Sequence, residues 1–289
     1  MGADHVVRAR SGRATGVQLA HAGRKASTQV PWLGRGPVDP ADGGWHAVAP
    51  SPVGYADWPT PKELTTQDIV DVVRAFADAA LRADRVGFDV VEVHAAHGDL
   101  LHEFLSPLTN QRADGYGGDL AVRARIVLEV ADAVRAVWPD HMPLFVRVSV
   151  TDWAPGGWNV DETVELARML VGHGIDLIDV SSGGLVPEQK VELGPGYQVP
   201  FARAVREGSG LPVAAVGLIT EPAQAEQILA EGSADAVLLA RALLRDPSWP
   251  LRAAHELAVD VAWPPQHLRA PGRRSTCGAP GSELNACQR

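Results

Sequence analysis

The sequence contains little cysteine, no long apolar run and no excess of positive charge. Its two cysteines, Cys277 and Cys287, lie near the C-terminus, and neither belongs to a C-x-x-C spacing. A core without disulfide bonds favours a reducing cytoplasm, which we predict as the compartment. No apolar run approaches the ~20 residues that span a bilayer, and the first residues lack the apolar segment of a secretory signal. The net charge of −9 disfavours a nucleic-acid-binding function.

The composition is that of an ordinary globular protein, with 46% hydrophobic and 21% charged residues. The length of 289 residues suits one β/α barrel of about 250 residues or two smaller domains. We predict a single barrel-type domain over residues 1–263. Residues 264–289 are rich in Gly, Pro and Ser, which predicts a disordered tail.

Six short apolar runs alternate with longer runs of helical periodicity. Short, continuous apolar strands are typical of a parallel sheet that is covered on both faces. Repeated strand–helix units predict helical crossovers between such strands. The strands are expected at residues 16–19, 89–93, 144–148, 177–180, 213–216 and 236–239. The helices are expected at residues 68–85, 120–137, 161–171, 198–206, 222–231 and 247–257.

Several helix starts carry local signals. Thr65 and Asp68 have the spacing of a first-turn capping pair, and Asp246 suits an N-cap position. Pro222 and Pro247 suit the first turn of a helix, where a missing N–H costs nothing. No strand is followed by G-x-G-x-x-G, so a Rossmann dinucleotide site has no support. The alternation alone leaves open a doubly wound sheet or a barrel.

Residues 92–118 carry the strongest chemical signal. The run GFDVVEVH is a buried-strand pattern that ends at His94, with His97 in the turn that follows. Parallel β/α enzymes present their chemistry at the carboxyl ends of strands, and two neutral imidazoles can donate hydrogen bonds to one ligand oxygen. The spacing alone also permits a metal site with His102 and Glu103 as further ligands, or a structural polar pair.

Polar residues also follow the other predicted strands, which for a barrel is the catalytic face. The long segment 23–64, rich in Pro, Gly and Trp, is predicted to be a functional loop. The strand-end residues are Gln18, His21, His94, His97, Arg147, Ser149, Ser181, Ser182, Gly217 and Arg241.

The ordered motifs resemble those of the old yellow enzyme family over about residues 5–258. They read GVQLAHAGRKAS, WHAVAPS, GFDVVEVHAAHGDLLHEFLSPLTNQRADGYGG, FVRVSVTDW, DLIDVSSGG, AAVGLI and ADAVLLARALLRDPSW. The paired histidines make the chain most similar to the bacterial, NADPH dehydrogenase-like branch. The resemblance implies a TIM (β/α)8 barrel, FMN as cofactor and NADPH or NADH as reductant.

The resemblance also implies a cofactor site. Gln18 resembles the glutamine that hydrogen-bonds the flavin pyrimidine edge. Arg147 resembles the arginine whose charge stabilises the reduced, anionic flavin. Ala240 and Arg241 resemble the Gly-Arg pair that binds the FMN phosphate, with Ala in place of the usual Gly, and Gly217 is expected to allow close backbone approach.

His94 and His97 resemble the pair that grips the carbonyl oxygen of an α,β-unsaturated substrate. The implied reaction is ping-pong hydride transfer from NAD(P)H through flavin N5 to the alkene. At position 99 the family has a tyrosine that protonates the α-carbon, whereas this chain has Asp99. Because an aspartate is an anion at neutral pH and cannot donate, we expect weakened alkene reduction. The two rival hypotheses are an impaired flavin-binding remnant and, less favoured, a metal-dependent barrel enzyme.

The family's barrel has eight strands, and six are visible in this sequence. By the family's order, the first two strand–helix units, about 80 residues, are expected to be missing. Two exposed sheet edges would result. A misplaced start codon or a broken gene would explain this, as would closure of the gap by a partner chain or a rearranged N-terminus. The expected partners are a small electrophilic alkene and a second copy in a homo-oligomer.

Overall fold

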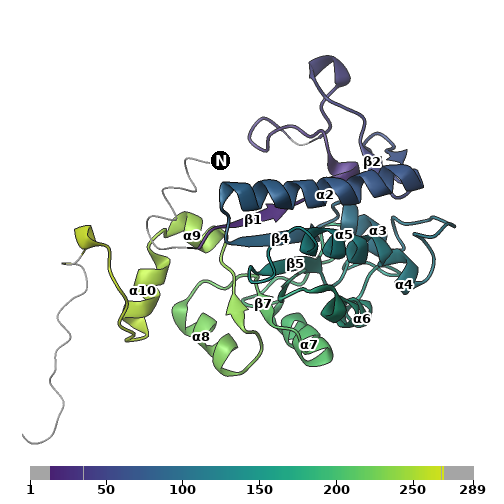
Figure 1. Cartoon of the computed structure of the whole chain (residues 1–289). Coiled ribbons are helices and arrows are strands. Elements are labelled where there is room, and N and C mark those ends of the chain that lie inside the picture. The colour runs from purple at the N-terminus through teal and green to yellow at the C-terminus, as the bar shows by residue number, and fades with distance from the viewer. Residues whose placement is uncertain (1–13, 35, 268, 270–289) are drawn as a thin grey trace, which may run out of the picture.

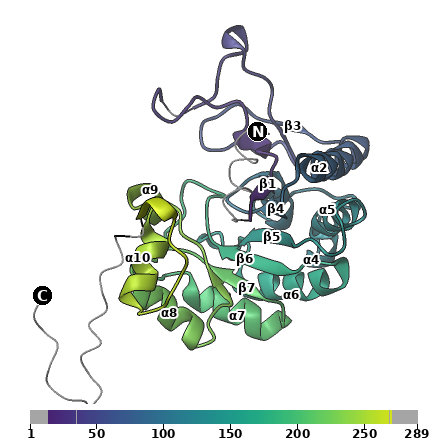
Figure 2. The same ribbon diagram turned by 60° about the vertical axis from the view of Figure 1, so that its left-hand side comes forward.

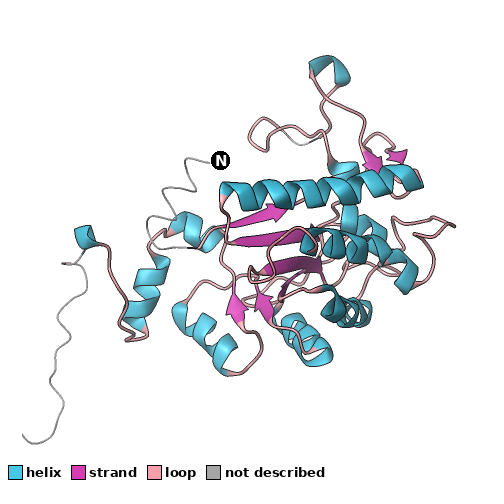
Figure 3. Ribbon diagram, in the orientation of Figure 1, coloured by secondary structure: helices cyan, strands magenta, loops and turns pink. Residues whose placement is uncertain are grey.

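The computed structural model describes residues 14–34, 36–267 and 269. Its main sheet has six strands, all parallel, in the order β1-β4-β5-β6-β7-β8 (Figures 1 and 3). The strands are β1 (Gly16–Leu19), β4 (Val90–Ala95), β5 (Leu144–Ser149), β6 (Leu177–Ser181), β7 (Val213–Ala215) and β8 (Ala236–Val237). All six predicted strands are therefore present, with shifts at their ends.

Helices cover one face of this sheet, which curves so that they form an outer layer (Figure 2). The arrangement is an open portion of a (β/α)8 barrel, with β1 and β8 at its two edges. This confirms the predicted fold class. The outer helices are α2 (Thr66–Val86), α4 (Leu120–Arg123), α5 (Arg125–Arg135), α6 (Val160–Leu170), α7 (Val199–Ser209), α8 (Pro222–Ala230) and α10 (Trp249–Glu256).

Helix α2 shows how local sequence sets an element's bounds. The Thr65 side chain accepts from the Asp68 backbone N–H, while the Asp68 carboxylate accepts from the Thr65 N–H, which confirms the predicted capping pair. At the other end, Gly87 takes a left-handed conformation with φ 89°, which glycine adopts without a Cβ clash. The chain then turns directly into β4.

Other helix predictions need correction. The helix expected over 120–137 is two helices separated at Ala124. The helix expected from Pro247 begins at Trp249, with Pro250 rather than Pro247 in its first turn, and Ser248 rather than Asp246 at the N-cap. Asp246 instead ends a short helix that was not predicted, α9 (Arg241–Arg245). A second unpredicted helix, α3 (Leu100–Leu105), follows β4. Both are too short to show periodicity.

The two faces of the central strands differ sharply. Val91, Val93 and Ala95 of β4 point toward the helices and are fully buried, as are their counterparts in β5 and β6. The alternate residues of β4, Val90, Glu92 and His94, face the inside of the curved sheet. The apolar core thus lies between sheet and helices, and the polar side chains lie on the inner face.

The segment predicted as a long loop contains short elements and projects beyond the sheet (Figure 1). It holds the 3-10 turns η1 (Gly23–Lys25) and η2 (Pro40–Asp42), and the strands β2 (Val48–Ala49) and β3 (Lys62–Glu63), which pair in parallel. Two further 3-10 turns are η3 (Val171–His173) and η4 (Pro265–His267). Most of the predicted tail, with Cys277 and Cys287, lies outside the described residues, and the domain division stays a prediction. In the part described, no helix is long and apolar enough to cross a membrane.

Candidate active site

The two histidines of the predicted substrate site do come together at the end of β4. Their ring centroids lie 5.1 Å apart, and both side chains are largely buried. His94 stands in register with Arg147 of β5, which in turn pairs with Asp179 of β6. Three neighbouring strands therefore place an imidazole, a guanidinium and a carboxylate along one line of the inner face, with His97 in the turn after β4.

His97 lies in a tight turn with φ 58°, in the left-handed region that residues other than glycine rarely adopt. Its backbone N–H donates to Ser149 Oγ at 2.8 Å, and its Nε2 lies 2.7 Å from Ser181 Oγ. Burial, followed by the positive charge of Arg147, lowers the pKa of His97 to about 3. The ring is therefore neutral at physiological pH and can act as a single hydrogen-bond donor.

Asp99, in the position expected for the proton donor, contacts one of these histidines. Its Oδ2 lies 3.3 Å from His94 Nε2, and its Oδ1 lies 3.8 Å from Lys25 Nζ. Lys25 also donates to the carbonyl oxygens of His97 and Gly184, and burial lowers the pKa of Lys25. An acidic side chain, a lysine and the two histidines thus share one wall of the site.

Arg147 has a carboxylate partner that the sequence did not suggest. Its Nε lies 3.2 Å from Asp179 Oδ2, and Asp179 is almost fully buried. Burial raises the pKa of Asp179 to about 7, against the opposing charge of Arg147 and with a smaller contribution from Glu92. Glu92 is itself bound by Gln18, whose Nε2 donates to Glu92 Oε1 at 2.6 Å.

A polar cavity of about 200 Å³ opens beside Arg147 at the ends of β6, β7 and β8. Arg241 and Arg245 line it together with Arg147, and no carboxylate does. Three guanidinium groups without an acidic lining residue suit a phosphate dianion. This observation fits the FMN phosphate that was predicted to bind at Ala240 and Arg241, and it adds Arg245 to the set.

Gly217 lines this same cavity, whereas Gln18 does not. A Cβ at Gly217, which has φ 115°, would lie 2.7 Å from Gln198 Nε2 and 2.9 Å from the Tyr197 ring. The close approach at Gly217 is thus made by the chain's own side chains. Gln18 lies on the edge strand and lines a separate cavity of about 660 Å³ against α2, rather than the phosphate cavity.

His102 and Glu103, the further ligands of the metal alternative, contact groups of the chain itself. Its Nδ1 accepts from the Gly98 N–H at 2.9 Å, and its Nε2 lies 3.0 Å from Asp152 Oδ1. Glu103 accepts from the Arg24 N–H, and burial raises the pKa of Glu103 to about 8. Within the described ranges, no group of three or more His, Cys, Asp or Glu side chains could hold a metal ion.

Sequence reasoning missed Lys25, Glu92, Asp152, Asp179 and Arg245 as parts of this region. Two of them did leave a signal. Glu92 and Asp179 are single acids within otherwise apolar strands, VVEVH and LIDVS, and a buried acid in a strand needs a partner. Lys25 ends the 3-10 turn η1 and Asp152 lies in a loop, and neither has such a signature, so only the fold brings them to the site.

The fold and this site together define an α/β-barrel oxidoreductase of the flavin-binding type. A sequence model of the NADH:flavin oxidoreductase / NADH oxidase family matches residues 7–260, and the chain belongs to that family. The family's cofactor is FMN and its reductant is a reduced nicotinamide nucleotide, as predicted. The resemblance stated from the motifs is thus confirmed.

Curated relatives agree with this assignment. The NADPH dehydrogenase of Geobacillus thermodenitrificans (strain NG80-2) is 49% identical over 259 residues, which cover 89% of this chain and 71% of that protein. The NADPH dehydrogenase of Halalkalibacterium halodurans (strain ATCC BAA-125 / DSM 18197 / FERM 7344 / JCM 9153 / C-125) is 44% identical, over 90% of this chain and 71% of the relative.

Solved structures of similar fold include a 2-naphthoyl-CoA reductase in complex with 2-naphthoyl-CoA, with a TM-score of 0.75 and 26% identity. That match covers 86% of this chain and 39% of the reductase chain. Morphinone reductase in complex with tetrahydroNAD matches with a TM-score of 0.68 and 28% identity, over 89% of this chain and 69% of the other.

Proposed function

We propose that the chain oxidises NAD(P)H and reduces an activated alkene, an α,β-unsaturated carbonyl compound, by ping-pong hydride transfer. Bound FMN supplies the hydride transfer chemistry between the two substrates. The observation that carries the proposal is the pair of imidazoles, His94 and His97, next to Arg147. Arg147 also lines the arginine-rich cavity at the ends of β6, β7 and β8. NADPH is the first reductant to test, given the relatives' names.

The protein residues bind and polarise. Neutral His97, together with His94, donates hydrogen bonds to the substrate carbonyl oxygen, which makes the β-carbon electrophilic. Arg147 would place positive charge beside the bound flavin, and Arg241 with the Ala240 backbone would hold its phosphate. Gln18, which now donates to Glu92, would hydrogen-bond the pyrimidine edge, and Gly217 has the positive φ that allows close backbone approach.

Asp99 is expected to slow the alkene step because of its position beside His94. Its carboxylate lies 3.3 Å from His94 Nε2, close enough to compete with the substrate carbonyl oxygen for that nitrogen. Asp99 also lacks the phenolic O–H that a tyrosine at this position would donate. Flavin reduction by NAD(P)H is therefore expected to survive while alkene reduction is slow.

Two half-reactions measured separately test the proposal. The purified chain is loaded with FMN, freed of excess cofactor and mixed anaerobically with NADPH, and the reduced protein is then mixed with 2-cyclohexen-1-one. Bleaching of the flavin absorbance followed by its return supports the proposal. Bleaching without return favours the impaired-remnant hypothesis, and failure to retain flavin contradicts FMN binding by this chain.

Two variants separate the charge of Asp99 from its missing proton. Because general acids contribute about 10²–10⁴-fold, Asp99→Tyr is expected to speed flavin reoxidation by the enone at least tenfold. Asp99→Asn has nearly the same size without the charge, so it reports how much of that gain comes from releasing His94. An unchanged reoxidation rate in Asp99→Tyr would show that Asp99 does not limit the alkene step. NADPH-driven reduction is the internal control.

Three further expectations belong to the proposal. The partner is a small electrophile, and nucleic acid is not a partner, given the charge of −9. The cytoplasm remains the predicted compartment. A homo-oligomer remains a prediction, which light scattering of the purified chain would test.

A further inference from the structure

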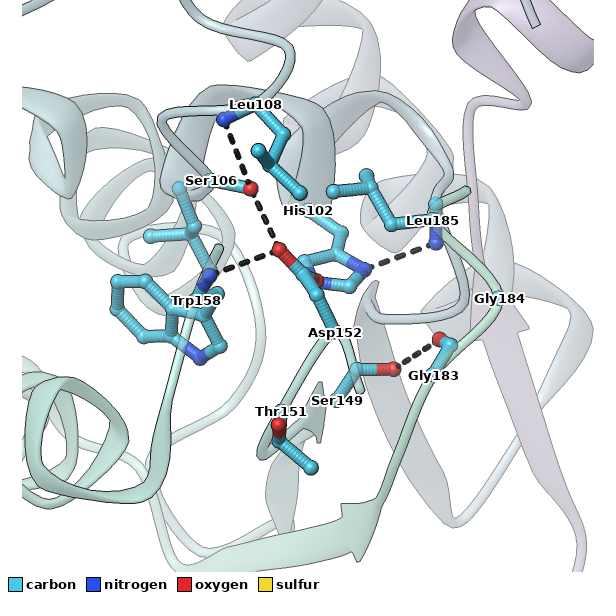
Figure 4. Close-up of polar contacts among 12 residues, drawn as sticks. His102, Ser106, Leu108, Ser149, Thr151, Asp152, Trp158, Gly183, Gly184 and Leu185 are labelled. Carbon is cyan, nitrogen blue, oxygen red and sulfur yellow. Dashed lines mark hydrogen bonds and ion pairs between the residues drawn. The ribbon is translucent and has the colours of Figure 1, made fainter. Parts of the chain in front are cut away.

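A buried histidine–aspartate pair lies directly behind the catalytic turn. The side chains of His102, in α3, and Asp152, after β5, are both fully buried. Nε2 of His102 and Oδ1 of Asp152 lie 3.0 Å apart in an ion-pair contact, and neither atom makes a hydrogen bond to any described residue. The second carboxylate oxygen, Oδ2, accepts from Ser106 Oγ at 2.6 Å and from the Trp158 N–H at 2.8 Å (Figure 4).

The contacts of His102 fix the position of its proton. The Gly98 N–H donates to Nδ1 at 2.9 Å, and an atom that accepts such a bond carries no proton. In a neutral ring the proton therefore lies on Nε2, the nitrogen that is 3.0 Å from Asp152 Oδ1. Asp152 is in turn held by two donors, so it cannot easily turn away.

Gly98 belongs to the turn that aims His97. Gly98 has φ 72°, next to φ 58° at His97, and a Cβ at Gly98 would lie 2.4 Å from Gly184 O. The two consecutive N–H groups of the turn are each bound by a side chain, that of His97 by Ser149 and that of Gly98 by His102. Ser149 Oγ also donates to Gly183 O at 2.9 Å (Figure 4).

We propose that His102 and Asp152 form a positioning pair, which holds the proton of His102 on Nε2 so that Nδ1 can anchor Gly98 and thereby aim the His97 ring into the substrate site. The pair touches neither substrate nor cofactor. The inference rests on the proposed role of His97, but it concerns the placement of a side chain, which can be measured without turnover.

The first test needs no variant. The full chain, labelled with ¹⁵N-histidine and loaded with FMN, is studied by long-range ¹H–¹⁵N correlation NMR, with His102 assigned by its loss in His102→Gln. A neutral ring protonated on Nε2 at pH 7 is expected. A proton on Nδ1, or a ring protonated on both nitrogens, would overturn the proposal.

The second test uses Asp152→Asn. The variant side chain has nearly the same size, but it places an NH₂ donor where the carboxylate oxygen faced His102 Nε2. The amide oxygen is needed by Ser106 and Trp158, so the NH₂ group faces His102 Nε2 and two donors meet. Moving the proton to Nδ1 would only set it against the Gly98 N–H. The turn is expected to loosen and His97 to leave its buried position.

The pKa of His97 reports that displacement, because exposure of the ring would raise the pKa whereas loss of the Asp152 charge alone would lower it. The charged and titratable groups around it are Arg147, His94, His102 and Asp99, and its pKa of about 3 follows first from burial. In Asp152→Asn the pKa of His97 is expected to rise toward the ordinary histidine value of 6.5. Loss of a negative charge without displacement would lower it instead. A folded Asp152→Asn protein whose His97 pKa is unchanged or lower contradicts the proposal.

The chain offers a matched control. His173 Nδ1 lies 2.6 Å from Asp132 Oδ1 in an exposed pair, so Asp132→Asn removes a His–Asp contact far from the turn in sequence. It is expected to leave the His97 titration unchanged. If Asp152→Asn gives no cooperative melt, the wild-type proton position on His102 still decides. Because neither spectrum needs an alkene, a failed enone reaction would leave this inference separately testable.

Discussion

The outer and inner faces of the same strands carry different kinds of side chain. On the outer face of β4, β5 and β6, aliphatic side chains meet the helices and exclude water completely. On the inner face, the same strands carry Glu92, Arg147 and Asp179, which form ion pairs or hydrogen bonds, with Asp179 buried and Arg147 partly exposed. The same strands therefore supply apolar packing on one face and charged side chains on the other.

The two faces should therefore respond differently to mutation. Apolar burial contributes through area and packing density, so an outer substitution should change stability without changing the chemistry. Inner groups are held by pairing, so their replacement should change binding or titration more than stability. Variants of outer and inner residues should therefore give separable changes in stability and in cofactor binding.

The largest effect is expected for Ile178→Ala, on the outer face of β6. Ile178 is fully buried between Val146 and Val213 of the adjacent strands, so the truncation leaves a cavity. A loss of about 2–5 kcal/mol in the free energy of unfolding is expected, against about 0.5–1.5 kcal/mol for Ile178→Val. Urea unfolding measures both. A change of more than twofold in FMN affinity of the folded variant would break the separation of the faces.

Arg241→Gln tests the phosphate cavity at the strand ends. Losing a charge-assisted hydrogen bond of about 1.5–3 kcal/mol should weaken FMN binding by roughly 10- to 100-fold. Riboflavin, which lacks the phosphate, should bind as before, and quenching of flavin fluorescence measures both affinities. Arg74→Gln, at an exposed pair with Asp71 on α2, is the control. Equal losses for FMN and riboflavin would place Arg241 elsewhere in the site.

Asp179→Asn tests the inner face through pH. The pKa of Asp179 is raised from 3.8 to about 7, so between these values the folded protein holds a proton that the unfolded chain has lost. Stability of the wild type should therefore fall as pH rises through that window, and the variant should lack this contribution. The difference in Tm between pH 5 and pH 8 should shrink by a few degrees, since about 2–4 °C corresponds to 1 kcal/mol. An unaltered difference would mean that Asp179 is ionised throughout.

The smallest effect is expected for Thr65→Ala, which removes the cap of α2. The lost acceptor for the Asp68 N–H should cost about 1 kcal/mol of stability, and Thr65→Ser should restore most of it. Thermal melts measure the loss. Neither variant should alter FMN affinity or the His97 titration, because the cap lies on the outer layer.

The sequence alone determined the order of the elements and the identity of the principal site residues. Apolar runs gave six strands at their correct places, since a strand buried by helices must be apolar whatever surrounds it. His94, His97 and Arg147 could be predicted as site residues from their positions near the carboxyl ends of predicted strands. Parallel strands bring those ends to one edge of the sheet. Short elements such as α3 and α9 escaped, because five or six residues carry no readable period.

The charge and proton states of the site depend on contacts that form only in the folded chain. Asp99 reaches His94, Asp179 reaches Arg147 and Asp152 reaches His102 across distances in sequence that no local pattern encodes. Burial then sets the direction of each pKa shift, as it does for His97 and Asp179, because desolvation depends on the neighbours that the fold supplies. The residue types are written in the sequence, whereas their chemistry depends on which partners the fold places within about 3 Å of them.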